Sequence, residues 1–271
     1  MVFIIRDTMK KTALFFPIFV LMMCLCACGP FKADGAAAPE KATIETEQAE
    51  NIQETEKSKE SEKAKALIVI DAGHQARGNS EPEPIGPGAT ETKARVSGGT
   101  SGYVSGLAEY ELTLELAMQL RDELLLRGYR VIMVRESNEV DISNAQRAAI
   151  ANEARADAFI RIHANGSENT AAKGAMTICQ TPENPYNGDL YPQSRGLSDA
   201  VLNSLVTATG CEKERVWETD TMSGINWCRV PVTIVEVGYM TNPEEDALLA
   251  TADYQHKIIL GIAEGIDRFL K

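Results

Sequence analysis

Residues 67–74 read Leu-Ile-Val-Ile-Asp-Ala-Gly-His, and this stretch indicates how the chain folds. Its first four residues form a continuous apolar run, which is typical of a strand buried on both faces of a parallel sheet. The Asp-Ala-Gly that follows is typical of a loop, so we expect His74 to lie just past the carboxyl end of the strand. Ligands bind at that end of the strands in open α/β sheets. His74 is therefore a candidate functional residue.

Two further apolar runs lead directly to a residue that can bind a metal or transfer a proton. Residues 158–162 are followed by His163, and residues 232–235 are followed by Glu236. The predicted helices cover residues 109–127, 143–154, 194–209, 243–249 and 253–270, and additional strands cover 129–134 and 174–179. This alternation predicts a single α/β domain with a largely parallel central sheet, helices on both faces, and a site at the carboxyl ends of the strands.

The predicted helix over 109–127 has the clearest pattern in the chain. Leucines recur at every fourth position from Leu112 to Leu124, and Gly128 follows as a stop. Glu109 stands at the first position of this helix, where the chain leaves a long loop. An acid at that position is often only a solvated side chain favoured by the helix dipole, and this alternative stays open.

Two histidines and one carboxylate, His74, His163 and Glu109, are a common ligand set for catalytic zinc. Such a set leaves a fourth position for water, whose pKa the metal lowers towards about 7. The reaction also needs a carboxylate that does not bind the metal and that moves protons. Glu236, inside an apolar run, is the candidate for that role. The simpler alternative is that each histidine is only a turn residue after a strand.

Four segments taken together carry a resemblance to a known family. They are Ile-Val-Ile-Asp-Ala-Gly-His over 68–74, Glu-Tyr-Glu-Leu-Thr-Leu-Glu-Leu-Ala over 109–117, Phe-Ile-Arg-Ile-His-Ala-Asn over 159–165, and Val-Glu-Val-Gly-Tyr-Met-Thr-Asn over 235–242. In this order they resemble the motifs of the zinc-dependent N-acetylmuramoyl-L-alanine amidases, which are cell-wall amidases.

The resemblance implies a role for each of the four candidate residues. His74, Glu109 and His163 would be zinc ligands, and Glu236 would be the catalytic carboxylate. The implied substrate is peptidoglycan, cut at the amide between the lactyl group of N-acetylmuramic acid and L-alanine of the stem peptide. A zinc peptidase acting within the stem peptide is the alternative among enzymes. A non-catalytic wall-binding protein is the other alternative, and the presence of Glu236 counts against it.

The chain departs from the family pattern in three places, and none of them is a predicted ligand. Ala72 stands where proline is commoner, Arg161 occupies a position that is usually small, and the interval between His74 and Glu109 is long. Arg135 and residues 147–152 fall where the family has its arginine-bearing segments.

Residues 76–106, between two predicted ligands, are rich in glycine and proline and have a loop-like composition. We expect this loop to form one wall of the substrate groove. The alternative is a disordered insertion, which costs little in chain entropy. On the first interpretation, shortening residues 79–102 should leave zinc binding nearly intact while it changes the KM or the muropeptides that are cut.

The first 65 residues are predicted to lie outside the catalytic domain, which we assign to residues 66–271. Residues 1–28 have a charged start, a short apolar core and small residues at the end, as a secretory signal does. That end resembles a bacterial lipobox, which implies lipid on Cys28 and an anchor at the outer face of the cell membrane. Plain secretion is the alternative. Residues 29–65 predict a disordered acidic tether, because they have too few apolar residues to form a core.

The remaining features constrain the function less. The formal net charge of −12 makes a nucleic-acid partner improbable, and the chain predicts no particular protein partner. A Cys211–Cys228 disulfide is conceivable, but free thiols are at least as favoured. Trp217 and Trp227 are equally consistent with stacking on substrate and with packing on the core. Asp71 is expected to be structural and to accept the free N–H of a ligating histidine. His256 is expected at the surface.

Overall fold

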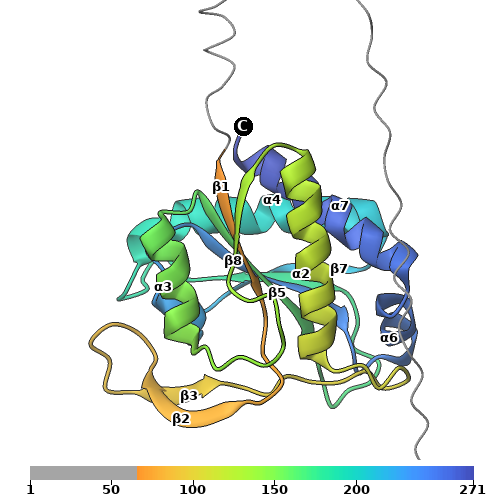
Figure 1. Ribbon diagram of the computed structural model, residues 1–271, viewed down its shortest axis with the longest axis horizontal. Coiled ribbons are helices and arrows are strands. Elements are labelled where there is room, and N and C mark those ends of the chain that lie inside the picture. The colour runs from red at the N-terminus through yellow and green to blue at the C-terminus, as the bar shows by residue number, and fades with distance from the viewer. Residues whose placement is uncertain (1–65) are drawn as a thin grey trace, which may run out of the picture. The chain divides into compact units, whose positions relative to one another are not determined.

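A six-stranded sheet forms the centre of the domain that the computed structural model describes, residues 66–271 (Figure 1). In spatial order the strands are β4 (Arg130–Met133), β1 (Leu67–Ala72), β5 (Ala158–Asn165), β8 (Val232–Tyr239), β6 (Ala175–Cys179) and β7 (Lys213–Glu218). The first four run parallel, β6 pairs antiparallel with β8, and β7 pairs parallel with β6. The predicted α/β class and largely parallel sheet are therefore confirmed.

Helices cover both faces of this sheet, as predicted. The helices are α2 (Glu109–Leu126), α3 (Asn144–Ala154), the 3-10 turn η1 (Gly188–Leu190), α4 (Tyr191–Thr209), α5 (Ser223–Asn226), α6 (Pro243–Leu249) and α7 (Ala252–Phe269). One core cluster joins β1 and β5 to α2, α4 and α7, and a second cluster joins the opposite face to α3 and α5.

The alternation of side chains along β1 and β5 explains the two clusters. Ile68 and Ile70 of β1 lie in the first cluster, whereas Val69 lies in the second. On β5, Ile160 and Ile162 likewise lie in the first cluster and Phe159 in the second. Residues 161 and 163 therefore share a face with Phe159, on the side of α3 and α5.

The leucine pattern of the predicted 109–127 helix packs as expected. The four leucines from Leu112 to Leu124 are fully buried in the first cluster. Truncating a buried leucine to alanine costs about 2–5 kcal/mol, so this row is a main attachment of α2 to the sheet. Gly128 follows the helix with a φ of 82°, a left-handed conformation that glycine adopts without strain. The helix thus ends where the sequence indicates, and Glu109 stays at its first position.

The structure corrects the predicted ends of two strands. β5 continues past His163 to Asn165, and β8 continues past Glu236 to Tyr239. The two strands remain paired over these extensions, with a register shift between His163 and Asn165. His163 and Glu236 thus lie within paired strands, near their carboxyl ends, and not in loops. The hydrogen bonds between the two strands hold their backbone in place.

Residues 76–106 contain a hairpin that the sequence did not predict. β2 (Asn79–Pro84) pairs antiparallel with β3 (Thr92–Val96), below α3 in Figure 1. Prolines normally argue against a strand because they cannot donate to the ladder. A two-stranded hairpin leaves one side of each strand unpaired, so Pro82 and Pro84 are tolerated there. β7 was also not predicted, because its sequence Lys-Glu-Arg-Val-Trp-Glu is largely polar, as suits an edge strand.

Within residues 66–271, no helix is long and apolar enough to cross a membrane. The predicted signal (1–28), the tether (29–65) and the lipidation residue Cys28 lie outside the described residues.

Candidate metal and catalytic site

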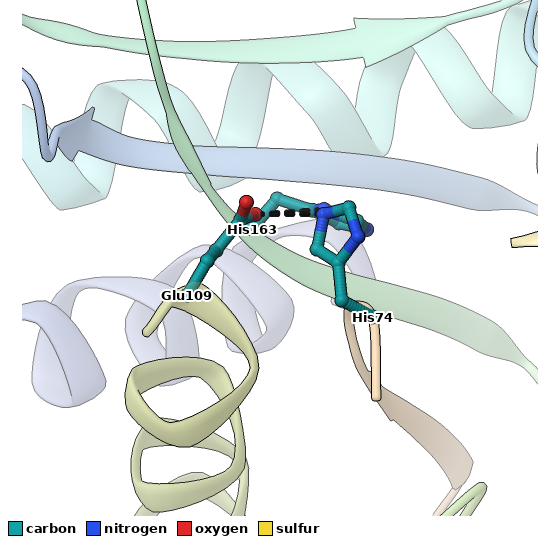
Figure 2. Close-up of side chains that lie close together, drawn as sticks. All are labelled: His74, Glu109 and His163. Atoms are coloured by element: carbon teal, nitrogen blue, oxygen red, sulfur yellow. Dashed lines mark hydrogen bonds and ion pairs between the residues drawn. The ribbon is translucent and has the colours of Figure 1, made fainter. Parts of the chain in front are cut away.

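Three predicted ligands converge from three separate elements. His74 lies in the loop after β1, Glu109 begins α2, and His163 lies on β5, and Figure 2 shows their side chains pointing towards one another. His74 Nε2 is 3.0 Å from Glu109 Oε1 and 3.0 Å from His163 Nδ1. His163 Nδ1 is 3.2 Å from Glu109 Oε1. The three atoms form a compact triangle of donors that could hold a metal ion.

The size and chemistry of this triangle fit zinc. Ligand atoms at zinc distances of about 2.0–2.2 Å in a tetrahedron are roughly 3.3 Å apart, close to the separations here. Burial lowers the pKa of His163 to about 4, so its imidazole is neutral at pH 7, as a metal ligand must be. Burial alone would raise the pKa of Glu109, but its close contacts with His163 and His74 hold it well below its usual range. The carboxylate is therefore ionised.

The ring of His74 is oriented by the loop between β3 and α2. Its Nδ1 donates a hydrogen bond to the carbonyl oxygen of Ser97, at 2.9 Å. With the proton on Nδ1, the lone pair of Nε2 faces the other two donors. The backbone of His74 has a φ of 60°, which is unusual for a residue with a side chain.

Two arginines hold the backbone of the His74 loop. Arg135 donates to the carbonyl oxygens of Ala72 and Gly73, and Arg147 donates to those of Ala72 and His74. Arg147 has no exposed surface, and Arg135 is 3% exposed. The arginine-bearing segments noted in the sequence thus stabilise the strained turn that carries His74, a candidate ligand.

Asp71 is structural, as predicted, but it does not accept a proton from a histidine. Its two oxygens accept hydrogen bonds from Arg147 Nη1 at 2.6 Å and from Arg161 Nε at 2.9 Å. Burial would raise the pKa of Asp71, but the adjacent guanidinium groups of Arg147 and Arg161 lower it to about 2. Neither histidine donates to it: His74 Nδ1 donates to Ser97, and His163 Nε2 has no hydrogen-bond partner among residues 66–271. The expected contact is therefore wrong.

Glu109 is buried and not a solvated first-turn acid. Its Oε2 accepts from the backbone N–H of Thr100 at 2.9 Å, and its Oε1 accepts from that of Ala164 at 3.1 Å. These contacts hold the carboxylate between the loop before α2 and the end of β5. The sequence alternative for this residue is therefore excluded.

Two glycines allow the backbone to approach the donors closely. A Cβ at Gly73 would overlap the ring of His163, so the Asp-Ala-Gly-His segment needs glycine there. Gly99 has a φ of 80°, and a Cβ on it would lie 2.9 Å from Glu109 Oε2. Gly99 thus lets the backbone of residues 97–100 lie directly against His74 and Glu109.

Glu236 lies beside the donor triangle. It pairs in register with His163 across β5 and β8, which places both side chains on the same face. Its Oε2 is buried and, within residues 66–271, has no hydrogen-bond partner. Burial and the negative charge of Glu109 raise the pKa of Glu236 to about 8. The structure therefore places an unengaged carboxylate next to the candidate metal ligands.

The four residues open into one cavity of about 650 Å³. Its floor is the face of β5 and β8 that carries residues 161, 163, 234 and 236. Residues 96–100 form part of one side, and residues 164–168 form part of another. The segment 76–106 thus contributes to the wall of the cavity.

The other residues singled out from the sequence lie away from this cavity. Trp217 and Trp227 pack against the second core cluster, and Trp227 Nε1 donates to the carbonyl oxygen of Pro84, so the packing alternative is favoured. His256 is exposed on α7. Cys211 and Cys228 are free, as is the third cysteine of the described residues.

Sequence reasoning missed two parts of the site. The carbonyl of Ser97 and the N–H of Thr100 are backbone groups, and no residue pattern reveals them. In the sequence Arg161 stands out only as a departure from the family pattern, which by itself predicts no role for it. A charged residue two positions before His163 in an apolar strand must share the face of that ligand, and this was the available signal.

Fold and site together define an α/β domain with three converging donors that could hold a metal ion and that open into a cavity. Residues 68–268 match the family model described as N-acetylmuramoyl-L-alanine amidase, so the chain belongs to that family.

Relatives and solved structures agree with this assignment. An N-acetylmuramoyl-L-alanine amidase of Mycobacterium tuberculosis is 27% identical over 208 residues, which cover 75% of this chain and 86% of the relative. The germination-specific N-acetylmuramoyl-L-alanine amidase of Bacillus subtilis is 28% identical over 190 residues, covering 64% and 75% of the two chains. The crystal structure of the amidase Ami1 from Mycobacterium smegmatis superposes with a TM-score of 0.69 at 26% identity, covering 76% of this chain and 97% of Ami1.

Proposed function

We propose that this protein is a zinc-dependent amidase that cleaves peptidoglycan between N-acetylmuramic acid and L-alanine of the stem peptide. In this proposal His74, Glu109 and His163 hold one zinc ion, and Glu236 is the catalytic acid and base. The observation that carries it is the pairing of His163 with Glu236, which sets an unengaged buried carboxylate beside three converging donors. The family match over residues 68–268 supports the choice of substrate.

The chain's own residues divide the chemistry between them. Zinc, when bound, would supply a Lewis acid and lower the pKa of a water molecule in the site. Glu236 in its ionised form, which the charge of a bound zinc ion would favour, takes a proton from the attacking water and passes it to the amide nitrogen as the carbon–nitrogen bond breaks. The products are a lactyl carboxylate on the glycan and a peptide with a free L-alanine amine. The buried contacts of His74 and Glu109 keep their donor atoms in place during these steps.

The substrate class implies that the enzyme works outside the cytoplasm, where peptidoglycan lies. We further propose that residues 1–28 direct export and that Cys28 carries the lipid that anchors the protein to the outer face of the membrane. Two or three acyl chains anchor durably, because each buried methylene contributes about 0.8 kcal/mol. Residues 29–65 would then act as the tether between this anchor and the catalytic domain.

Digestion of purified sacculi by the purified protein, with and without a chelator, tests the proposed function. Mass spectrometry of the products should find peptides that begin with L-alanine and glycan strands free of peptide, and chelation should stop their release. Products shortened within the stem peptide would indicate the zinc peptidase. Binding to sacculi without any product would indicate a wall-binding protein.

A further inference from the structure

The floor of the cavity contains a buried arginine that the proposed chemistry does not use. Arg161 lies on β5 two residues before His163, so the two side chains share one face. The residue is only 3% exposed, yet it lines the cavity. Its Nε donates to Asp71 at 2.9 Å and its Nη2 donates to Asn144 Oδ1 at 2.8 Å. These two bonds fix the plane of the guanidinium.

The third guanidinium nitrogen of Arg161, Nη1, makes no such bond. Nη1 has no hydrogen-bond or ion-pair partner among residues 66–271. It lies against the backbone of Gly224 in α5, where a Cβ would overlap it. Ser223 and Gly224 line the same part of the cavity. The position is therefore a polar recess with one directed N–H donor group.

Arg161 has no ion-pair partner of its own among residues 66–271. Asp71 is shared by Arg147 and Arg161, so one carboxylate contacts two guanidinium groups. Arg147 has no exposed surface, and its bonds are all to the protein. Glu236 lies on the same face and interacts electrostatically with Arg161, but it forms no ion pair with it. Nη1 of Arg161 is thus left to the cavity, where an anionic group could pair with it.

The distance along the strand identifies which anionic group fits. Two residues of a strand span roughly 6.6 Å, which is the spacing of the Cα atoms of Arg161 and His163 along β5. An extended peptide advances roughly 3.3–3.6 Å per residue, so a group about two residues beyond the cleaved amide reaches the recess. In a stem peptide the residue after L-alanine is D-glutamate, whose α-carboxylate is either free or amidated.

We propose that Arg161 is a specificity-determining residue that binds this α-carboxylate through Nη1 and favours stem peptides in which it is free. The inference rests on the proposed amidase function. A charge-assisted hydrogen bond is strong, whereas an amide in the same place presents a neutral group to the guanidinium. The preference is expected mainly in KM, because the carboxylate is remote from the bond that is cut.

Two synthetic substrates test the proposal with the zinc-loaded protein: N-acetylmuramoyl-L-alanyl-D-glutamate and its D-isoglutamine counterpart. The unmodified enzyme should prefer the acid by on the order of 10- to 100-fold in kcat/KM. Arg161→Gln should lose this preference through a higher KM for the acid, and Arg161→Lys should restore part of it. Arg268→Gln removes an equal charge from the exposed end of α7 and should keep the full preference.

In case Arg161→Gln fails to fold, a second variant tests the position of Nη1 independently. Gly224→Ala keeps every charge but displaces the guanidinium of Arg161, so it too should lose the preference. Because the displaced group loosens its bond to Asp71, the Tm should fall, whereas the zinc content should stay close to that of the unmodified protein. Equal cleavage of both substrates by the unmodified enzyme, or a preference that survives in Arg161→Gln and Gly224→Ala, would overturn the proposal. Failure of the zinc-loaded enzyme to release lactyl products from either substrate or from sacculi would instead reject the amidase function itself.

Discussion

His163 of β5 and Glu236 of β8 occupy paired positions on neighbouring parallel strands, with both side chains on the face covered by α3 and α5. One offers a nitrogen to the donor triangle with His74 and Glu109, and the other has an oxygen without a partner. The pairing fixes a candidate metal ligand and a candidate proton carrier on one rigid support. The predictions that follow separate these two roles.

Removing His163 should remove the metal. The unmodified protein is expected to contain about one zinc per chain, and His163→Ala should lose most of it together with all detectable activity on sacculi. His256→Ala, on exposed α7, is the control and should keep both. Elemental analysis of the dialysed proteins measures the metal. Full cleavage by protein shown to be free of metal would contradict the assignment.

Changing Glu236 should separate metal binding from catalysis. Glu236→Gln is nearly isosteric and should retain zinc, because Glu236 is not one of the three converging donors. Its rate on sacculi should fall by about 10²–10⁴-fold, the usual contribution of a general acid or base. Metal analysis and initial rates on the same preparation decide the matter. Loss of zinc from this variant would make Glu236 a ligand and the role assignment wrong.

The buried Asp71 should make stability depend on pH in the acid range. Its pKa is about 2 in the folded protein against 3.8 ordinarily, so the ionised form favours folding. This contribution, about 2 kcal/mol, is complete above pH about 4 and is lost as the pH falls towards 2. Asp71→Asn should flatten that part of the stability profile and lower the free energy of unfolding at pH 7 by about 3–5 kcal/mol.

Urea unfolding between pH 2 and pH 7 measures both effects on Asp71. The control is Asp122→Asn, which removes an acid whose side chain is 63% exposed and should change little. An acid limb of the profile that is identical in Asp71→Asn and in the unmodified protein would refute the argument.

The hairpin of β2 and β3 should affect substrate handling and not metal binding. Lys93 Nζ donates to the carbonyl of Thr221 and Trp227 Nε1 donates to that of Pro84, so the hairpin braces the segment that carries α5. Replacing residues 81–94 with a short Gly/Ser bridge should leave the zinc content intact. It should also raise KM several-fold or change the muropeptides that are cut. Unchanged kinetics and products would show that the hairpin has no such role.

The structure shows that the deletion suggested by the sequence, residues 79–102, is longer than the hairpin test requires. A deletion of 79–102 would also remove the Ser97 carbonyl that orients His74 and the Thr100 N–H that binds Glu109. We therefore expect that longer deletion to lose the metal, in contrast with the sequence-based expectation. Comparing the two deletions therefore separates the role of the β2–β3 hairpin from that of residues 97–100, which hold His74 and Glu109.

The anchor proposed at Cys28 has its own test. The protein should fractionate with membranes, and Cys28→Ala should release it or stall its processing. Cys211→Ala, a free cysteine of the catalytic domain, is the control and should remain with the membranes. Protein found wholly in the medium with an unmodified N-terminus would argue for plain secretion.

The sequence alone determined the class of fold and singled out the four candidate residues that the structure brings together. Apolar runs that end near His74, His163 and Glu236 mark buried parallel strands, because local hydrophobic periodicity reflects which faces are covered. The leucines at every fourth position from Leu112 to Leu124 likewise predicted helix α2, with Glu109 as its first residue. The predicted helices lie within a few residues of those observed. Side-chain caps at Ser143 and Asn242 begin α3 and α6, and Gly128 and Gly210 follow α2 and α4 as stops.

Only the tertiary structure decided how these residues are held. The hairpin and the edge strand β7 depend on pairing between distant segments, which their composition does not reveal. Asp71 binds two arginines and not a histidine, because Arg147 and Arg161, from other elements of the chain, occupy both of its oxygens. The supports of His74 and Glu109 are backbone groups of residues 97 and 100, which every residue type offers equally. Their role follows from spatial proximity, and proximity across the chain is a property of the folded structure.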